Sequence, residues 1–232
     1  MMIGVIDVRL RLQAVVLDFD GVILDSETAE FEAHRRIFER CGARLTIEEW
    51  TSQIGLWSEG QGTRWHERLR ALSPAAPDLE SFQAEKSRLF AELLSVRPMP
   101  GIEALLDELE RADVPVAIAS TSPAHWVVGA AARVGIGTRV RTIVSANDVV
   151  RRKPAPDVYL EAVRRLSAEP ARSVAIEDSG PGVRSALAAW LKTVAIPHHL
   201  TDGHDLTGAH LRVASATELT LPALEALVDT DA

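Results

Sequence analysis

The chain has 232 residues, of which 47% are hydrophobic and 25% charged, and its formal net charge at pH 7 is −8. These fractions exclude a disordered chain, and the acidic excess does not favour a nucleic-acid binder, which usually carries a basic surface. Cys41 is the single cysteine, which excludes an intrachain disulfide and a zinc site built on cysteines. The chain shows neither the apolar run of a signal peptide nor a membrane-spanning stretch, so we predict a cytoplasmic protein with no membrane partner.

Short apolar runs rich in valine recur along the chain. A continuous run of this kind is typical of a strand that is buried on both faces of a parallel sheet. The first ten residues could add an edge strand or form a tail. The predicted strands are 14–17, 114–119, 142–144, 173–176 and 193–196.

Apolar residues at helical spacing separate these runs, and the last helical stripe includes Trp190 and extends to Leu191. Strands that alternate with helices predict right-handed crossovers and an α/β fold, a Rossmann-like doubly wound parallel sheet. The stretch 28–97 breaks this rhythm, because it shows helical stripes and no convincing strand. We therefore predict a catalytic core formed by 1–27 and 98–232, with an inserted α-helical domain at 28–97.

Polar side chains follow several of the predicted strands at their carboxyl ends, where open α/β sheets bind ligands. Segments that are distant in the sequence would thus deliver carboxylates, a hydroxyl group and an ammonium group to one edge. The candidates are Asp18 and Asp20 after the first strand, Ser120 and Thr121 after the second, Lys153 in a loop before a helix, and Glu177 and Asp178 after the fourth.

The carboxylate pairs indicate a hard cation, and Mg²⁺ prefers oxygen ligands of this kind. Acidic residues also cap helices, which would explain one pair but not two pairs that both follow buried strands. Asp18 is placed to attack phosphorus as a nucleophile and Asp20 to act as the acid and base. Ser120 and Lys153 would bind phosphate, although a turn hydroxyl and a solvated loop cation are the alternatives.

The same residues resemble the motifs of the haloacid dehalogenase superfamily. The matching segments, in the order of the family, are DFDGVILDSE from Asp18, ASTS around Ser120, RKPAPD around Lys153 and IEDSGPG around Asp178. The resemblance covers essentially the whole chain and is nearest to the branch of phosphatases and β-phosphoglucomutases. It implies a helical cap over the active site.

The resemblance also implies the ligands of Mg²⁺. They would be the Asp18 carboxylate, the Asp20 backbone carbonyl, Asp178, and Glu177 either directly or through water. Ser120 would bind the phosphate together with Lys153.

The predicted function is Mg²⁺-dependent hydrolysis of a small phosphate monoester, such as a sugar phosphate, by a monomer or weak dimer. A phosphomutase is the first alternative, but Pro123 and Ala124 replace the lysine and asparagine that contact the sugar phosphate in β-phosphoglucomutase. A dehalogenase would not need a cation or a proton donor, and a non-catalytic binding protein would not need the full set of polar residues.

Two further features have weaker interpretations. Trp57 could face the substrate or serve packing. The group of His198, His199 and His204 with Asp205 could bind a metal, but we expect a polar loop there.

Overall fold

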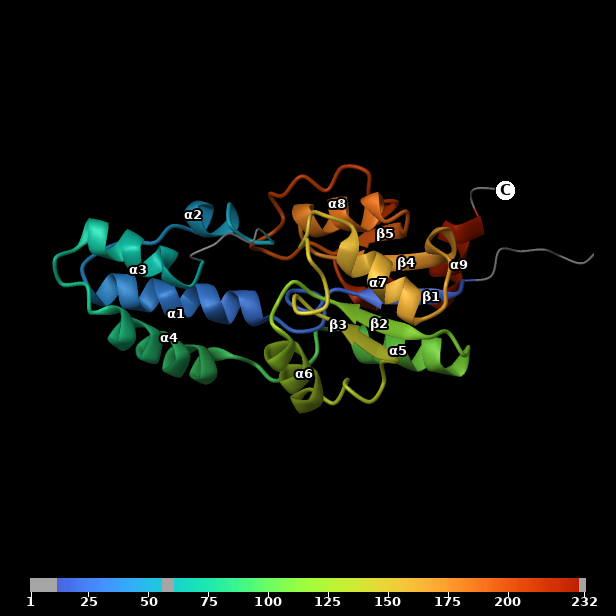
Figure 1. Ribbon diagram of the computed structural model, residues 1–232, viewed down its shortest axis with the longest axis horizontal. Coiled ribbons are helices and arrows are strands. Elements are labelled where there is room, and N and C mark those ends of the chain that lie inside the picture. The colour runs from blue at the N-terminus through green and yellow to red at the C-terminus, as the bar shows by residue number, and fades with distance from the viewer. Residues whose placement is uncertain (1–11, 56–60, 230–232) are drawn as a thin grey trace, which may run out of the picture.

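The computed structural model describes residues 12–55 and 61–229. Trp57 and the first ten residues therefore lie outside the described residues. Figure 1 shows two parts along the long axis of the molecule: a group of helices at one end, and a sheet with flanking helices at the other.

The secondary structure alternates between strands and helices outside the helical end. The described elements are β1 (Ala14–Leu17), α1 (Ser26–Arg40), α2 (Ile47–Thr51), α3 (Gln61–Leu72), α4 (Leu79–Leu93), α5 (Ile102–Arg111), β2 (Val116–Ala119), α6 (Ala124–Arg133), β3 (Thr142–Val144), α7 (Asp157–Arg165), the 3₁₀ turn η1 (Pro170–Arg172), β4 (Ser173–Glu177), α8 (Gly180–Ala188), β5 (Lys192–Ala195), β6 (Leu211–Arg212), the 3₁₀ turn η2 (Ala216–Glu218) and α9 (Leu221–Asp229).

The strands form one six-stranded sheet in the order β3-β2-β1-β4-β5-β6, and every pair is parallel. The predicted doubly wound parallel sheet is thereby confirmed. The direction in which strands are added reverses at β1, which lies between β2 and β4. Such a switch point leaves a crevice at the carboxyl ends of the strands, and ligands bind there.

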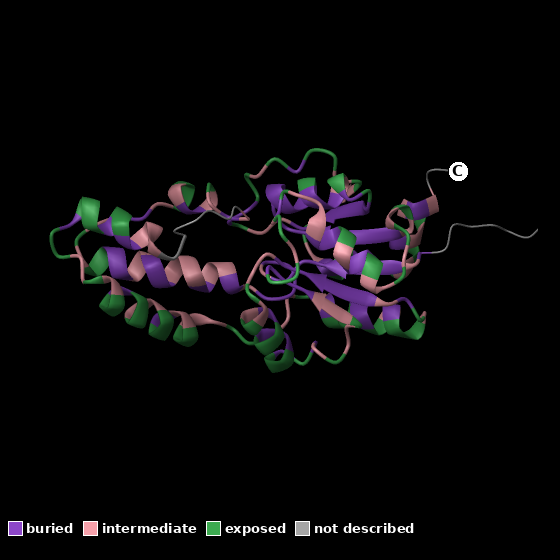
Figure 2. Cartoon of the chain, viewed as in Figure 1, coloured by how far each residue is buried: buried purple, intermediate pink, exposed green. Residues whose placement is uncertain are grey.

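The central strand β1 is buried on both faces, which explains its unbroken apolar sequence (Figure 2). Val15 and Leu17 belong to the core cluster beneath α5, α6 and α9. Val16 points the other way, into the cluster beneath α7 and α8. Burial of each such side chain contributes about 1.5–3 kcal/mol, so the sheet is held from both sides.

The helices α1 to α4 lie between β1 and β2 in the sequence and have a hydrophobic core of their own. Helix α1 begins after Asp25, whose side chain accepts a hydrogen bond from the backbone N–H of Thr28. Phe38 on α1, Leu69 on α3 and Phe82 on α4 are buried in this second core. The helical end therefore has a hydrophobic core separate from those of the sheet, and Leu200 from the loop after β5 also packs into it.

The structure differs from the sequence-based prediction at the end of α8. The apolar stripe predicts a helix as far as Leu191, but α8 ends at Ala188 and Trp190 is 80% exposed. Trp190 adopts a left-handed backbone conformation (φ 63°), which turns the chain away from the helix and into β5. Among the described helices, none is long and apolar enough to cross a membrane.

Candidate active site

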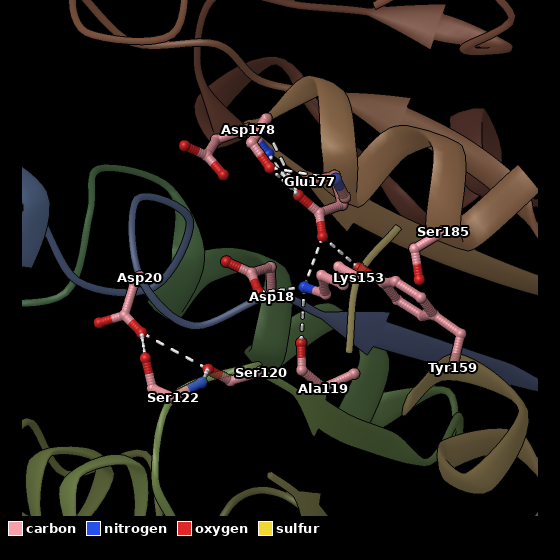
Figure 3. Close-up of polar contacts among 12 residues, drawn as sticks. Asp18, Asp20, Ala119, Ser120, Ser122, Lys153, Tyr159, Glu177, Asp178 and Ser185 are labelled. Carbon is pink, nitrogen blue, oxygen red and sulfur yellow. Dashed lines mark hydrogen bonds and ion pairs between the residues drawn. The ribbon is translucent and has the colours of Figure 1, made fainter. Parts of the chain in front are cut away.

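The candidate residues meet at the carboxyl ends of β1, β2 and β4 (Figure 3). Asp18 follows β1 directly, and its backbone N–H donates to the carbonyl of Ile176 in β4 at 2.9 Å. Glu177 is the last residue of β4 and Asp178 comes next. Carboxylate oxygens of Asp18, Glu177 and Asp178 lie within 4.8 Å of one another, and all three residues are buried.

Lys153 lies between two of these carboxylates. Its ammonium group donates to the carbonyl of Ala119 at 3.0 Å, to Glu177 Oε1 at 2.6 Å, and to Asp18 Oδ1. Burial alone would lower the pKa of Lys153, but the charges of Asp18 and Glu177 raise it above its ordinary value. Lys153 is therefore a permanent cation next to the Asp18 carboxylate.

Glu177 is fully buried and both of its carboxylate oxygens accept hydrogen bonds from the protein. Oε1 accepts from the Tyr159 hydroxyl at 2.6 Å as well as from Lys153. Oε2 accepts from the backbone N–H groups of Asp178 and Ser179 at 3.2 and 3.4 Å. A Cβ atom at Gly182 would lie 1.9 Å from Oε2, so only glycine lets α8 lie against this carboxylate. These contacts favour a role for Glu177 in holding Lys153.

The donor set fits a magnesium ion. Burial raises the pKa of Asp18 and of Asp178 well above the ordinary value, and the charge of Glu177 adds to both shifts. Clustered buried carboxylates repel one another, and a divalent cation with a preference for oxygen ligands would relieve that repulsion. Gly21 leaves the space beside this cluster open, because a Cβ atom there would lie 2.5 Å from Asp178 Oδ2. Asp18 and Asp178 would hold the ion most directly.

His198 contacts the same cluster from the loop after β5. Its Nε2 atom lies 3.1 Å from Asp178 Oδ2. The group of possible ion ligands found among residues 12–55 and 61–229 contains none of the histidines of this loop. His204 instead connects the two parts of the molecule: its Nδ1 accepts from the backbone N–H of Gly180 at 3.2 Å, and its Nε2 lies 3.0 Å from the carbonyl of Thr51.

The Asp20 carboxylate lies apart from this cluster and points towards Ser122 (Figure 3). Oδ1 accepts from the Ser26 hydroxyl at 2.6 Å and from the Trp126 indole at 3.0 Å. Oδ2 accepts from the Ser122 hydroxyl at 2.6 Å and from the Ser120 hydroxyl at 3.5 Å. Asp20 is thus held by hydrogen-bond donors from the start of α1, from the loop after β2 and from α6.

A cavity of about 610 Å³ joins the sheet edge to the helical end. Ser120, Thr121 and Lys153, which the sequence predicts to bind phosphate, line it at the sheet edge. Aromatic side chains line its far end, where Trp50 and Trp65 stack with ring centroids 5.0 Å apart. The cavity therefore offers a polar end for a charged group and an aromatic end for the remainder of a ligand.

Glu27 is an unusual carboxyl group in this cavity. Burial raises its pKa to about 8, and the charges of Asp20 and Glu30 add to the effect. The indole N–H of Trp50 donates to Glu27 Oε1 at 3.0 Å and opposes the shift. At neutral pH the Glu27 carboxyl is thus mostly protonated and can donate a hydrogen bond.

This shift predicts a pH-dependent effect of Glu27→Gln on stability. The folded protein keeps a proton on Glu27 that the unfolded chain releases near pH 4.5, so stability falls as pH rises from about 4.5 to 8. The glutamine does not ionise and can still accept from Trp50. We expect Glu27→Gln to be more stable than the unsubstituted protein by up to about 4 kcal/mol at pH 8 and by less than about 1 kcal/mol at pH 5, because each unit of the pKa difference corresponds to about 1.4 kcal/mol.

Urea unfolding at both pH values measures this difference. Glu161→Gln is a control of opposite sign, because hydrogen bonds from Arg164 and Arg165 lower the pKa of Glu161 to about 2. Ionised Glu161 stabilises the fold above its unfolded pKa, so its removal should reduce stability at neutral pH. A Glu27→Gln protein with the same stability gain at pH 5 and pH 8 would contradict the interpretation.

Several site residues are missing from the sequence-based prediction. Ser26, Trp126 and Tyr159 lie on helices, where a side chain's direction depends on how the helix packs. Ser26 and Ser122 lie inside the DFDGVILDSE and ASTS segments, which is the sequence signal that could have identified them, whereas Trp126 and Tyr159 lie outside the four matching segments.

The sequence resembles those of known hydrolases and phosphatases. Residues 15–196 match the family described as haloacid dehalogenase-like hydrolases. YhcW of Bacillus subtilis, named as a candidate phosphatase, is 32% identical over 92% of this chain and 96% of YhcW. A phosphorylated carbohydrates phosphatase of Thermotoga maritima is 31% identical, covering 85% of this chain and 91% of that protein.

The fold is also similar to that of a solved structure. The crystal structure of CbbY from Rhodobacter sphaeroides in complex with phosphate matches with a TM-score of 0.71 and 27% identity, over 90% of this chain and 96% of that one. The family match covers most of the chain, from β1 to the end of β5. The chain therefore belongs to the haloacid dehalogenase-like hydrolases.

Proposed function

We propose that this chain is a Mg²⁺-dependent phosphatase that hydrolyses a small phosphate monoester through an aspartyl-phosphate on Asp18. The observation that carries the proposal is the buried Asp18 carboxylate, which lies against Lys153 and within 4.8 Å of oxygens of Glu177 and Asp178 at the end of a cavity. The proposed nucleophile, a buried cation and the proposed metal ligands thus lie together.

The residues have distinct roles in this proposal. Asp18 attacks phosphorus, and the alcohol leaves with a proton that Asp20 supplies. Asp20 then takes a proton from the water that hydrolyses the aspartyl-phosphate. Lys153 and the hydroxyl of Ser120 hold phosphate oxygens, with Thr121 beside them. When bound at Asp18 and Asp178, Mg²⁺ would screen the anionic nucleophile from the anionic phosphate.

The far end of the cavity supports a sugar phosphate or a similar metabolite as substrate. Trp50 and Trp65 present aromatic rings there, and the protonated Glu27 carboxyl offers a hydrogen-bond donor. A relative that is 31% identical is a phosphatase of phosphorylated carbohydrates.

We further propose that 28–97 acts as a cap over a core of 1–27 and 98–232, in a cytoplasmic monomer or weak dimer.

An assay of the purified protein on aryl phosphates and on a panel of sugar phosphates tests the function. We expect release of inorganic phosphate in the presence of Mg²⁺ and a loss of at least about 100-fold after chelation, because metal ions supply several kcal/mol of charge stabilisation. No phosphate release from any substrate would refute the proposal. Transfer that needs an activating bisphosphate and releases little phosphate would support the phosphomutase alternative.

A further inference from the structure

Trp126 connects the Asp20 carboxylate to the helical end of the molecule. It lies in the first turn of α6, and its indole N–H donates to Asp20 Oδ1 at 3.0 Å. The ring also contacts Phe90 of α4 edge to face, with centroids 5.3 Å apart and planes at 61°. Trp126 thus contacts the proposed acid and base on one side and the helical insertion on the other.

We infer that Trp126 is a positioning residue: it fixes the direction of the Asp20 carboxylate, and Phe90 fixes the indole ring. This inference rests on the proposed function, because it assigns to Asp20 the proton transfers of a phosphatase. Trp126 itself transfers no proton and forms no bond with phosphorus.

The donors around Asp20 differ in how firmly their direction is set. The serine hydroxyls of Ser26 and Ser122 rotate freely, so each of them can turn its proton to another acceptor. An indole N–H points along the plane of its ring, so its direction is set wherever the ring is packed. Of the side chains that donate to Asp20 in the described part of the chain, Trp126 is the one with a fixed donor direction.

The contact with Phe90 places this donor at the wall of the cavity. Phe90 and Trp126 both line the cavity that also contains Asp20. Lys86, one helical turn before Phe90, places its ammonium group 5.9 Å from the centre of the Phe90 ring. The residues that hold the Asp20 carboxylate in its direction therefore border the same cavity as Asp20 itself.

Trp126→Phe tests the role of the indole N–H, because the phenyl ring keeps an aromatic contact with Phe90. A hydrogen bond to a charged group contributes enough to expect a loss of about tenfold in kcat for alkyl phosphates, whose leaving group needs a proton. Aryl phosphates have good leaving groups and should lose about twofold or less. KM should change little for both.

A double-mutant cycle separates positioning from general damage. In Asp20→Ala the acid is already absent, so adding Trp126→Phe should cause no further loss on either substrate. Phe90→Leu leaves the indole N–H in place but removes the ring edge, and we expect a loss of about threefold that is again confined to alkyl phosphates. Trp190→Phe, at the opposite edge of the sheet and 80% exposed, is the matched control and should behave as the unsubstituted protein.

A measurement independent of activity distinguishes this inference from the proposed function. In ¹H–¹⁵N spectra, the indole resonance that disappears in Trp126→Phe should shift upfield in Asp20→Ala, because the bond to the carboxylate is lost, while the Trp190 resonance stays in place. If Trp126→Phe does not fold, the Trp126 indole resonance can be assigned instead from Phe90→Leu, because loss of the Phe90 ring current shifts that resonance.

An unsubstituted protein without phosphatase activity overturns the proposed function, whereas the indole shift still reports the contact with Asp20. Equal losses for alkyl and aryl phosphates, a further loss in the Asp20→Ala background, or an indole resonance that does not respond to Asp20→Ala overturns the positioning role of Trp126.

Discussion

Asp18→Asn is expected to lower phosphatase turnover by at least about 1000-fold while the protein stays folded. The amide has the shape of the carboxylate but is not a nucleophile, so the covalent step is lost and only binding remains. Lys153 keeps its contacts with Glu177 and with the carbonyl of Ala119, so the buried ammonium group is not left without partners. Initial rates with an aryl phosphate, measured with saturating Mg²⁺, give the loss directly.

The stability of Asp18→Asn provides a second expected result. Burial and neighbouring carboxylates raise the pKa of Asp18, so its ionised form costs stability, and this cost grows as pH rises through the raised pKa. The uncharged asparagine should therefore melt no lower than the unsubstituted protein at neutral pH. Asp202→Asn, whose side chain is 73% exposed, is the matched control and should retain full turnover. A folded Asp18→Asn protein with near-normal Mg²⁺-dependent turnover would contradict the covalent mechanism.

The sheet could be predicted from the sequence because most of its strands are buried on both faces. An unbroken apolar run such as 14–17, followed by a pair of aspartates, is best explained as a buried strand that ends where the polar residues begin. β6 has only two residues, Leu211–Arg212, and neither is fully buried, so no apolar run marks it. At Trp190 the sequence pattern predicts too much helix instead of missing an element. An apolar residue at helical spacing need not be in the helix or in the core, and Trp190 is exposed.

The sequence predicts the site residues that follow strands but not the site residues that lie on helices. Asp18, Ser120 and Asp178 follow neighbouring parallel strands, so the topology alone brings them to one edge. Trp126 and Tyr159 reach the site only because α6 and α7 pack with particular rotations against the sheet. Sequence patterns identify which face of a helix is apolar, but they do not state which carboxylate a polar group on that helix will contact.

Lys153→Met is expected to have the largest effect on stability. The substitution removes the cation that lies between Asp18 and Glu177 and leaves buried carboxylates without it. Breaking a buried ion pair by removing one partner typically costs about 3–5 kcal/mol, because the other charge stays buried and unpaired. Urea unfolding at pH 7 without divalent ions should show a loss of that size, and turnover should fall as well because Lys153 is proposed to hold the phosphate.

The pH dependence and a compensating substitution identify the cause of this loss. Without Lys153, the pKa of Asp18 should rise further, so the stability deficit should grow as pH rises and shrink towards pH 4, where Asp18 is protonated. Adding Glu177→Gln to Lys153→Met removes one of the unpaired charges and should restore part of the stability, so the two effects are not additive.

Lys86→Met is the matched control: Lys86 is 28% exposed and pairs with Glu30 at 3.1 Å, and loss of such a pair costs about 0–1 kcal/mol. A Lys153→Met protein with unchanged stability across this pH range would show that the buried carboxylates do not depend on the ammonium group.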